Sequence, residues 1–186
     1  GDYPHLAANE YFCMTAVKRS GLPTPEFYLS EDGRLFVMKR FDLTADGMNL
    51  GFEDMCVLQG TGTDGKYDST CERVVKSINS YVSPQHRGAA REIFFQSLLL
   101  SVALRNGDGH LKNYGVVYDD PLGSDIRLAP IYDVVTTTAY IPRDIPALSL
   151  GGSKKWWSKA ALRAFGVSHC GLSQGKIGMI FTAVAA

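Results

Sequence analysis

Three polar side chains with a fixed spacing stand in the second half of the chain. Asp108 and Asn113 form an Asp-x-x-x-x-Asn pattern in a glycine-containing segment, and Asp133 follows twenty residues later, after an apolar run. In phosphoryl transfer from ATP, one carboxylate accepts the proton of the acceptor hydroxyl, while an amide and a second carboxylate hold Mg²⁺ on the phosphates. The spacing therefore indicates this chemistry, provided that the chain folds back and brings Asp133 to the other two residues.

Each residue of this segment also has a simpler explanation. Asp and Asn beside glycine are common in turns, which would account for Asp108 and Asn113 taken singly, and Asp133 could end a strand. His110 alone would be a partly buried hydrogen-bonding residue, and Lys112 a solvated surface charge. It is the joint spacing that favours phosphoryl transfer.

The segment from 106 to 113 must be held rigidly if it is to do chemistry. It follows residues 89–104, which are apolar on nearly all sides and predict a helix buried in the centre of a helical lobe. After it, residues 113–118 and 126–128 predict two short strands around a turn. This β-ribbon would return the chain, and with it Asp133, to the loop from which it started.

The rest of the chain completes a predicted α+β fold. Apolar residues spaced over 6–20 and followed by Gly21 are typical of a helix, and β-rich runs at 26–30 and 34–40 indicate a hairpin. Residues 43–65 are polar and glycine-rich and predict a connection between two subregions. Further helices are expected at 53–59, 70–81, 158–165 and 173–184.

Composition excludes several classes of protein. The chain has 186 residues, 45% of them hydrophobic, so it can bury one core or two small lobes around a cleft. Its 19 Lys and Arg balance 19 Asp and Glu, which argues against a protein that mainly neutralises nucleic acid or anionic lipid. The longest apolar stretch, residues 94–104, is about half of the ~20 residues that a membrane span requires, so we expect no membrane helix.

The cysteines indicate a reducing environment. Cys13, Cys56, Cys71 and Cys170 stand singly, without the spacing of metal ligands. We expect buried thiols in a cytoplasmic protein, although the sequence leaves a disulfide between two of them open.

At this point the motifs resemble those of a known family. The run from Asn106 to Asn113, followed by Ala129-Pro130-Ile131-Tyr132-Asp133, resembles the catalytic and metal-binding motifs of the HipA-like serine/threonine kinases, the toxins of bacterial HipBA toxin–antitoxin modules. Further motifs stand in the family's order along nearly the whole chain: Asn9-Glu10, Gly21-Leu22-Pro23-Thr24-Pro25, Lys39-Arg40-Phe41-Asp42, Glu53-Asp54-Met55, Lys66-Tyr67 and Leu148-Ser149-Leu150-Gly151-Gly152. Each is weak alone, but their ordered combination is specific.

The resemblance implies a role for each residue of the loop. Asp108 would be the catalytic base, and Asn113 and Asp133 would bind Mg²⁺ and, through it, ATP. His110 and Lys112 would lie beside the transferred phosphate. The protein would then transfer the γ-phosphate of ATP to a protein hydroxyl.

The resemblance also implies a division of the chain, which as residues 1–186 would be the family's C-terminal kinase domain. Residues 1–42 would be the remnant of an N-lobe, a helix plus a β-hairpin ending in the hinge, and residues 43–186 a mainly helical C-lobe with a small β-ribbon at the active site. At the hinge, Lys39 and Phe41 would bind adenine; an ordinary strand end with Phe41 in the core is the alternative.

The family's partners follow from the same resemblance. They are a protein substrate, with an aminoacyl-tRNA synthetase as precedent, and a HipB-like DNA-binding antitoxin through which DNA is contacted only indirectly. No membrane partner is implied.

Two features depart from the family or from ordinary kinases. The metal motif continues Asp-Val-Val instead of the Asp-Phe-Gly of protein kinases, which is normal for HipA-like proteins. No strand with a phosphate-binding lysine stands ahead of Leu6, and Lys18 lies inside the first expected helix. We therefore expect either a part of a longer protein or a shortened member, and weak ATP binding with slow or absent transfer by this chain alone.

Three other functions are compatible with the sequence. The chain could be a catalytically impaired binding module of the same ancestry, which binds nucleotide or antitoxin without turnover. It could be a small-molecule kinase of the aminoglycoside or choline type, which shares the Asp-x-x-x-x-Asn pattern. Residues 151–159 interleave basic and aromatic side chains and could bind nucleic acid, but a surface turn with two anchored tryptophans is favoured.

Overall fold

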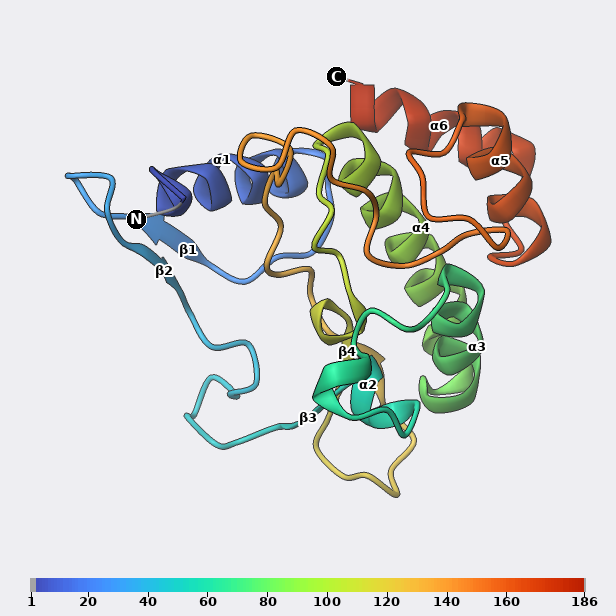
Figure 1. Cartoon of the computed structure of the whole chain (residues 1–186). Helices are drawn as coiled ribbons and strands as arrows, with labels where there is room; N and C mark the ends of the chain where they lie inside the picture. Colours follow the sequence, from blue (N-terminus) through green and yellow to red (C-terminus); the bar gives the residue numbers. More distant parts are fainter. Residues whose placement is uncertain (1–2, 186) are drawn as a thin grey trace.

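The computed structural model describes residues 3–185 and has the mixed helical and sheet architecture that the sequence predicts. Figure 1 shows α1 (Leu6–Arg19) and the hairpin of β1 (Phe27–Leu29) and β2 (Phe36–Met38) at one end of the molecule. Helices α3 to α6 lie at the other end, and β3 and β4 lie below α4 in this view. No helix within the described range is long and apolar enough to cross a membrane.

Helix α4 (Arg87–Ala103) is the centre of the helical part, as predicted. Its side chains Phe94 and Phe95 have no solvent exposure, and the helix packs against α3 (Cys71–Tyr81) and α6 (Gln174–Ala185). The helix ends where Arg105 adopts a left-handed backbone conformation, with φ of 57°. This turns the chain sharply into the loop that carries Asp108.

The first helix and the hairpin also agree with the prediction. Helix α1 buries Cys13, Met14 and Val17 and ends at Arg19, just before Gly21, which has a φ of 86° that favours glycine. The strands β1 and β2 pair antiparallel, with Tyr28 opposite Val37. Both of these side chains are more than half exposed, so this two-stranded sheet has one face in solvent.

The prediction for residues 53–59 was wrong at its start. Glu53 belongs to β3 (Gly51–Asp54), and the helix that follows, α2 (Met55–Leu58), has only four residues. Strand β3 pairs with β4 (Gly115–Tyr118), which pairs with β5 (Arg127–Leu128), so the expected two-stranded ribbon is a three-stranded sheet. A four-residue strand gives almost no local signal, because its hydrogen bonds come from a partner that is distant in sequence.

Asp54 explains why β3 changes directly into α2. It is the last residue of the strand, and its side chain accepts a hydrogen bond from the backbone N–H of Val57 at 2.9 Å, which caps the helix. Its backbone partner Gly115 has no room for a side chain, because a Cβ there would lie 2.7 Å from the Glu53 carbonyl oxygen.

The remaining elements close the helical part. Short 3₁₀ turns at Thr63–Gly65, Pro84–His86 and Leu111–Asn113 join the longer elements. Helix α5 (Lys159–Ser168), capped by Ser158, packs with α6, and the four cysteines are buried free thiols, as expected. Trp157 is 6% exposed and donates to the Ser153 carbonyl, while Trp156 donates to the Asp144 carbonyl, so both tryptophans anchor the turn.

Candidate active site

The loop after α4 is fixed by its own first residues. Asn106 is buried, and its side-chain oxygen accepts a hydrogen bond from the N–H of Asp108 at 3.0 Å. The N–H of Gly107 donates to the Thr137 hydroxyl at 2.8 Å. A Cβ at Gly107 would collide with the Asp144 carboxylate and the Thr137 hydroxyl, so a larger residue would displace these side chains. The backbone at Asp108 is therefore held from both sides.

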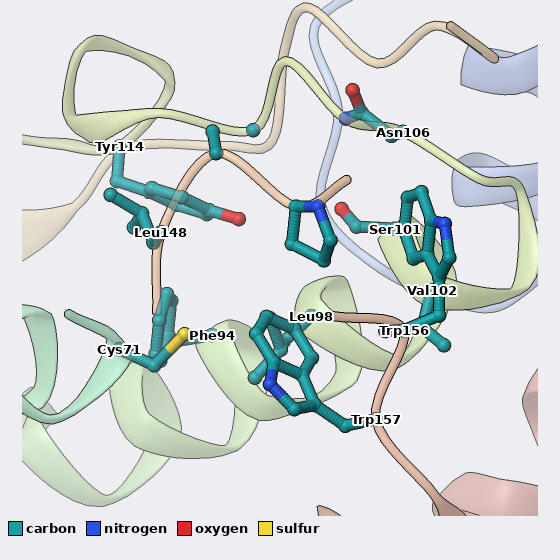
Figure 2. Close-up of a pocket in the computed structure, with 13 residues that line it drawn as sticks. Cys71, Phe94, Leu98, Ser101, Val102, Asn106, Tyr114, Leu148, Trp156 and Trp157 are labelled. Atoms are coloured by element: carbon teal, nitrogen blue, oxygen red, sulfur yellow. The ribbon is translucent and has the colours of Figure 1, made fainter. Parts of the chain in front are cut away.

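An apolar layer supports this loop from below. Figure 2 shows Phe94, Leu98, Tyr114 and Trp157 around a small hollow, with Asn106 in the loop segment that passes above it. The hollow has a volume of about 20 Å³. It has room for about one water molecule and is therefore too small for a ligand. The side chains around it support the loop by packing beneath it.

Asn113 joins the loop to Asp133. The N–H of His110 donates to the Asn113 side-chain oxygen at 2.8 Å, and the Asn113 amide nitrogen donates to Asp133 Oδ2 at 2.6 Å. Asp133 has a left-handed backbone with φ of 59°, which is uncommon for a residue other than glycine. The chain thus folds back and brings together two residues that are twenty positions apart in sequence.

Helix α1 holds the segment that follows Asp133. The Asn9 amide donates to the Thr136 carbonyl at 3.0 Å, and its oxygen accepts from the Thr136 N–H at 2.9 Å. These two hydrogen bonds connect residues 127 positions apart in sequence. They fix the segment after Asp133 to helix α1.

Asp108 has a tyrosine as its direct partner. The hydroxyl of Tyr67 donates to Asp108 Oδ1 at 2.6 Å. Burial, and then the hydrogen bond to Asp108, raise the pKa of Tyr67 to about 12, so the tyrosine is neutral and acts as the donor. The second carboxylate oxygen of Asp108 is left for another hydroxyl.

His110 lies under the loop as a neutral ring. It is 5% exposed, its Nε2 lies 3.9 Å from Asp108 Oδ1, and its ring meets that of Tyr67 edge-on. Burial lowers the pKa of His110, with Asp108 acting in the opposite direction. Its Nδ1 is buried without a hydrogen-bond partner among the described residues.

Asp108 and Asp133 line the same cavity, of about 510 Å³, which we call the inner cavity. Glu10 and Asp144 also line it, so that four carboxylates face one space. Burial raises the pKa of Asp133, and the negative charge of Asp108 raises it further. Burial and the charge of Asp133 raise the pKa of Glu10 to about 7. The inner cavity therefore favours a cation.

The donor set suits Mg²⁺ when phosphate oxygens complete it. Asp133 and Asn113 carry carboxylate and amide oxygens, the hard ligands that Mg²⁺ prefers, and the Asn113 oxygen also accepts a hydrogen bond from the N–H of His110. Over residues 3–185, no group of three or more His, Cys, Asp and Glu is arranged to hold a metal ion. A cation here would thus take only part of its coordination from the protein, as is usual for Mg²⁺ at nucleotide phosphates.

Of the residues singled out in the sequence, Asp108 and Asp133 line the inner cavity, whereas His110, Asn113, Lys112, Lys39 and Phe41 do not. Lys112 Nζ lies 2.7 Å from Asp54 Oδ2, and this pairing raises the pKa of Lys112. Lys39 Nζ lies 3.6 Å from Glu26 Oε2 on the exposed hairpin. The ring of Phe41 stacks on that of Tyr132, the residue that precedes Asp133, with 5.0 Å between centroids. The structure therefore brings together Asp108, His110, Asn113 and Asp133.

Three residues of this site were not predicted from the residue spacing. Glu10 lines the inner cavity, Asn9 holds the segment after Asp133, and Tyr67 donates to Asp108. Their only signal was membership in the short motifs Asn9-Glu10 and Lys66-Tyr67, which agreed with the family's order. Because these residues lie far from Asp108 in sequence, their spacing could not predict that they meet it in the fold.

Comparison with solved structures identifies the class of fold. The HipA chain of a Shewanella oneidensis HipA, HipB and operator DNA complex matches 98% of this chain and 47% of its own, with a TM-score of 0.80 and 21% identity. The Helicobacter pylori proinflammatory kinase CtkA matches 96% of this chain and 81% of its own, with a TM-score of 0.60 and 14% identity. The chain thus has the fold that HipA and CtkA share.

Comparison with sequences gives the family. The HipA-like C-terminal domain family matches residues 1–186, and the chain belongs to it. "Putative kinase Y4dM" of Sinorhizobium fredii is 29% identical over 168 residues, which are 82% of this chain and 40% of that protein. A "Putative kinase" of Haemophilus influenzae is 29% identical over 153 residues, 75% of this chain and 43% of that protein. The chain spans less than half the length of these relatives.

Proposed function

We propose that this chain carries the catalytic centre of a HipA-like serine/threonine protein kinase, which transfers the γ-phosphate of ATP to a protein hydroxyl. The observation that carries the proposal is the convergence of Asp108 and Asp133 on one cavity, with the Asn113 amide 2.6 Å from Asp133 Oδ2. This is the arrangement that phosphoryl transfer requires.

In the proposed reaction the acceptor oxygen attacks the γ-phosphorus. The new P–O bond forms as the bond to the oxygen bridging the β- and γ-phosphates breaks, and ADP leaves. Asp108 accepts the proton of the acceptor hydroxyl on the carboxylate oxygen that Tyr67 does not occupy. We place neutral His110 beside Asp108 and the transferred phosphate.

Asn113 and Asp133 would hold Mg²⁺, which supplies charge neutralisation for the phosphates when it is bound. Their mutual hydrogen bond orients both side chains before nucleotide arrives. Lys112 would contact the phosphates only after leaving Asp54, and Lys39 and Phe41 would contact adenine at the hinge. In this proposal residues 1–42 form the N-lobe part and hinge, and residues 43–186 the C-lobe.

The proposed partners come from the same likeness. The Shewanella oneidensis complex contains HipB and operator DNA, which supports a HipB-like antitoxin as partner, with DNA bound through the antitoxin. We propose a cytoplasmic protein substrate, with aminoacyl-tRNA synthetases as the first candidates.

Calorimetric titration of ATP into this chain, with and without Mg²⁺, tests the cation site. We expect Mg²⁺ to strengthen ATP binding, and Asp133→Asn to weaken the Mg²⁺-dependent part by at least about tenfold, because a charged carboxylate ligand becomes a neutral amide. Asp46→Asn, in an exposed loop, is the matched control. Equal ATP affinity with and without Mg²⁺ would contradict the proposal.

A phosphate-transfer assay on the complete gene product separates the proposal from its alternatives. Transfer to serine and threonine peptides supports a protein kinase, and transfer to aminoglycosides or choline instead would favour a small-molecule kinase. Mg²⁺-dependent ATP binding without any transfer would favour the binding module.

A further inference from the structure

A second hollow adjoins the inner cavity on the other side of Tyr67. It has a volume of about 250 Å³ and opens widely to solvent, and we call it the outer groove. Tyr67, Ser69, Thr70, Arg73, Ser149 and Lys154 line it, together with Asp68. Because Tyr67 lines both hollows and donates to Asp108, the outer groove leads directly to the proposed base.

The floor of the outer groove is preformed by the backbone. The N–H of Cys71 donates to the Ser149 carbonyl at 2.8 Å, and the N–H of Ser149 donates to the Ser69 carbonyl at 3.2 Å. The N–H of Gly151 donates to the Glu72 carboxylate at 2.8 Å. These bonds tie the segment around Ser149 to the start of α3, so the groove does not have to form when a ligand arrives.

A tight turn places Lys154 at this groove. Gly151 and Gly152 both have left-handed backbone, with φ of 59° and 75°, between Leu150 and Ser153, whose backbones are hydrogen-bonded to each other. Two successive positive φ values are the mark of a type I′ turn and favour glycine at both positions. The turn brings Lys154 Nζ to 2.9 Å from the Tyr67 carbonyl oxygen.

The outer groove carries positive charge that the described part of the chain leaves uncompensated. Arg73 and Lys154 are both exposed, and within residues 3–185 neither forms an ion pair. Asp68 is the one acidic residue that lines the groove, so the two cations exceed it by one charge. The Lys154 hydrogen bond goes to a neutral carbonyl and leaves its charge free.

We propose that the outer groove binds an acidic segment of the acceptor protein, with Glu or Asp side chains on Arg73 and Lys154, and so presents a nearby hydroxyl to Asp108. This inference rests on the proposed kinase function and specifies its substrate class. The acceptor enters past Tyr67 from the outer groove, while nucleotide phosphates occupy the inner cavity.

The test compares two matched charge reversals. Arg73→Glu with Lys154→Glu changes the groove, and Lys76→Glu with Lys155→Glu makes the same change in net charge at exposed positions outside the groove. The probes are fluorescent serine peptides that differ only by Glu or Gln on both sides of the serine. Fluorescence anisotropy measures peptide binding, and phosphate transfer by the complete gene product gives KM and kcat.

We expect the groove variant to weaken binding of the Glu peptide, and raise its KM, by roughly tenfold, since two ion pairs are lost and replaced by repulsion. The affinity for ATP and for the Gln peptide should stay within about twofold, as should all values for the control variant. Circular dichroism and the thermal midpoint confirm that each variant is folded. The single changes Arg73→Ala and Lys154→Ala should each give part of the loss.

Failure of this inference is distinct from failure of the proposed function. Two outcomes would contradict binding of an acidic segment in the outer groove and leave the kinase proposal unaffected. One is phosphate transfer without preference for the Glu peptide. The other is an equal loss of Glu-peptide binding in both charge-reversal variants. Glu-selective binding that the groove variant abolishes, without any transfer, would support the groove and contradict the kinase proposal. A short DNA duplex that displaces the Glu peptide equally well at physiological salt would overturn it in favour of a general anion site.

Discussion

The inner cavity and the outer groove share one wall and differ in charge. Four carboxylates face the inner cavity, whereas two cations and one carboxylate line the outer groove, and Tyr67 lies between the two. The chain as a whole has a net charge of zero. Burial and the local grouping of charges decide what each hollow attracts, and in our proposals these ligands are a cation with phosphates in the inner cavity and an acidic peptide in the outer groove.

The largest effect is expected when the proposed base, Asp108, is removed from the inner cavity. Asp108→Asn should lower the rate of phosphate transfer by about 10²- to 10⁴-fold, the usual contribution of a positioned general base. ATP affinity should change little, because Asp108 does not hold the phosphates in the proposal. A rate close to that of the wild type would remove Asp108 from the mechanism, and Asp46→Asn serves as the control.

A smaller effect on the rate of phosphate transfer is expected at Tyr67, which lies between the two hollows. Tyr67→Phe removes the hydroxyl that orients Asp108, and a hydrogen bond to a charged group contributes about 1.5–3 kcal/mol, of which only part acts on the transition state. We expect kcat to fall by up to about tenfold, with the preference for acidic peptides retained. Tyr81→Phe removes a hydroxyl that donates to the Leu58 carbonyl, outside both hollows, and should leave kcat unchanged. If Tyr67→Phe also leaves kcat unchanged, the hydroxyl does not position the base.

The close approach of carboxylates in the inner cavity should make the stability of the protein depend on pH. The pKa of Glu10 is raised from its ordinary 4.5 to about 7, so between these values the folded protein binds more protons than the unfolded chain. The free energy of unfolding should therefore fall as pH rises through this window. Glu10→Gln should make the free energy of unfolding, measured by urea denaturation, less dependent on pH between 5 and 7.5. Exposed Glu31→Gln should not alter the slope, and an unaltered slope in Glu10→Gln would mean that Glu10 is already ionised.

The smallest effect concerns a pair that belongs to neither hollow. A double-mutant cycle with Asp54→Asn and Lys112→Met should give a coupling energy of about 0.5–1 kcal/mol in urea denaturation, because Lys112 is partly exposed. A coupling near zero would mean that the pair does not stabilise the fold. Calorimetric titration of ATP into the Lys112→Met variant tests the role of Lys112 directly. Unchanged ATP affinity would show that Lys112 pairs with Asp54 and does not contact the phosphates. Weaker ATP binding would show that it does contact them.

The parts of the fold that could be predicted have strong local signals. Helix α4 was readable from a segment that is apolar on nearly all sides, and α1 from apolar spacing followed by Gly21. Strand β3 could not be found, because four residues paired with a distant strand carry no period of their own. Lys112 shows the same limit at the level of a side chain, since nothing in its neighbourhood in sequence predicts a contact with Asp54.

The sequence by itself determined the chemistry that is available: Asp108, Asn113 and Asp133 at a spacing typical of phosphoryl transfer, next to a helix that had to be buried. It also indicated the family, because ordered short motifs extend along nearly the whole chain, and the family model matches residues 1–186. Only the tertiary structure decided that Glu10 and Tyr67 join this chemistry and that Arg73 and Lys154 meet beside it. The reason is physical: backbone pattern follows from neighbours in sequence, whereas burial, charge and hydrogen bonding depend on which distant segments are packed together.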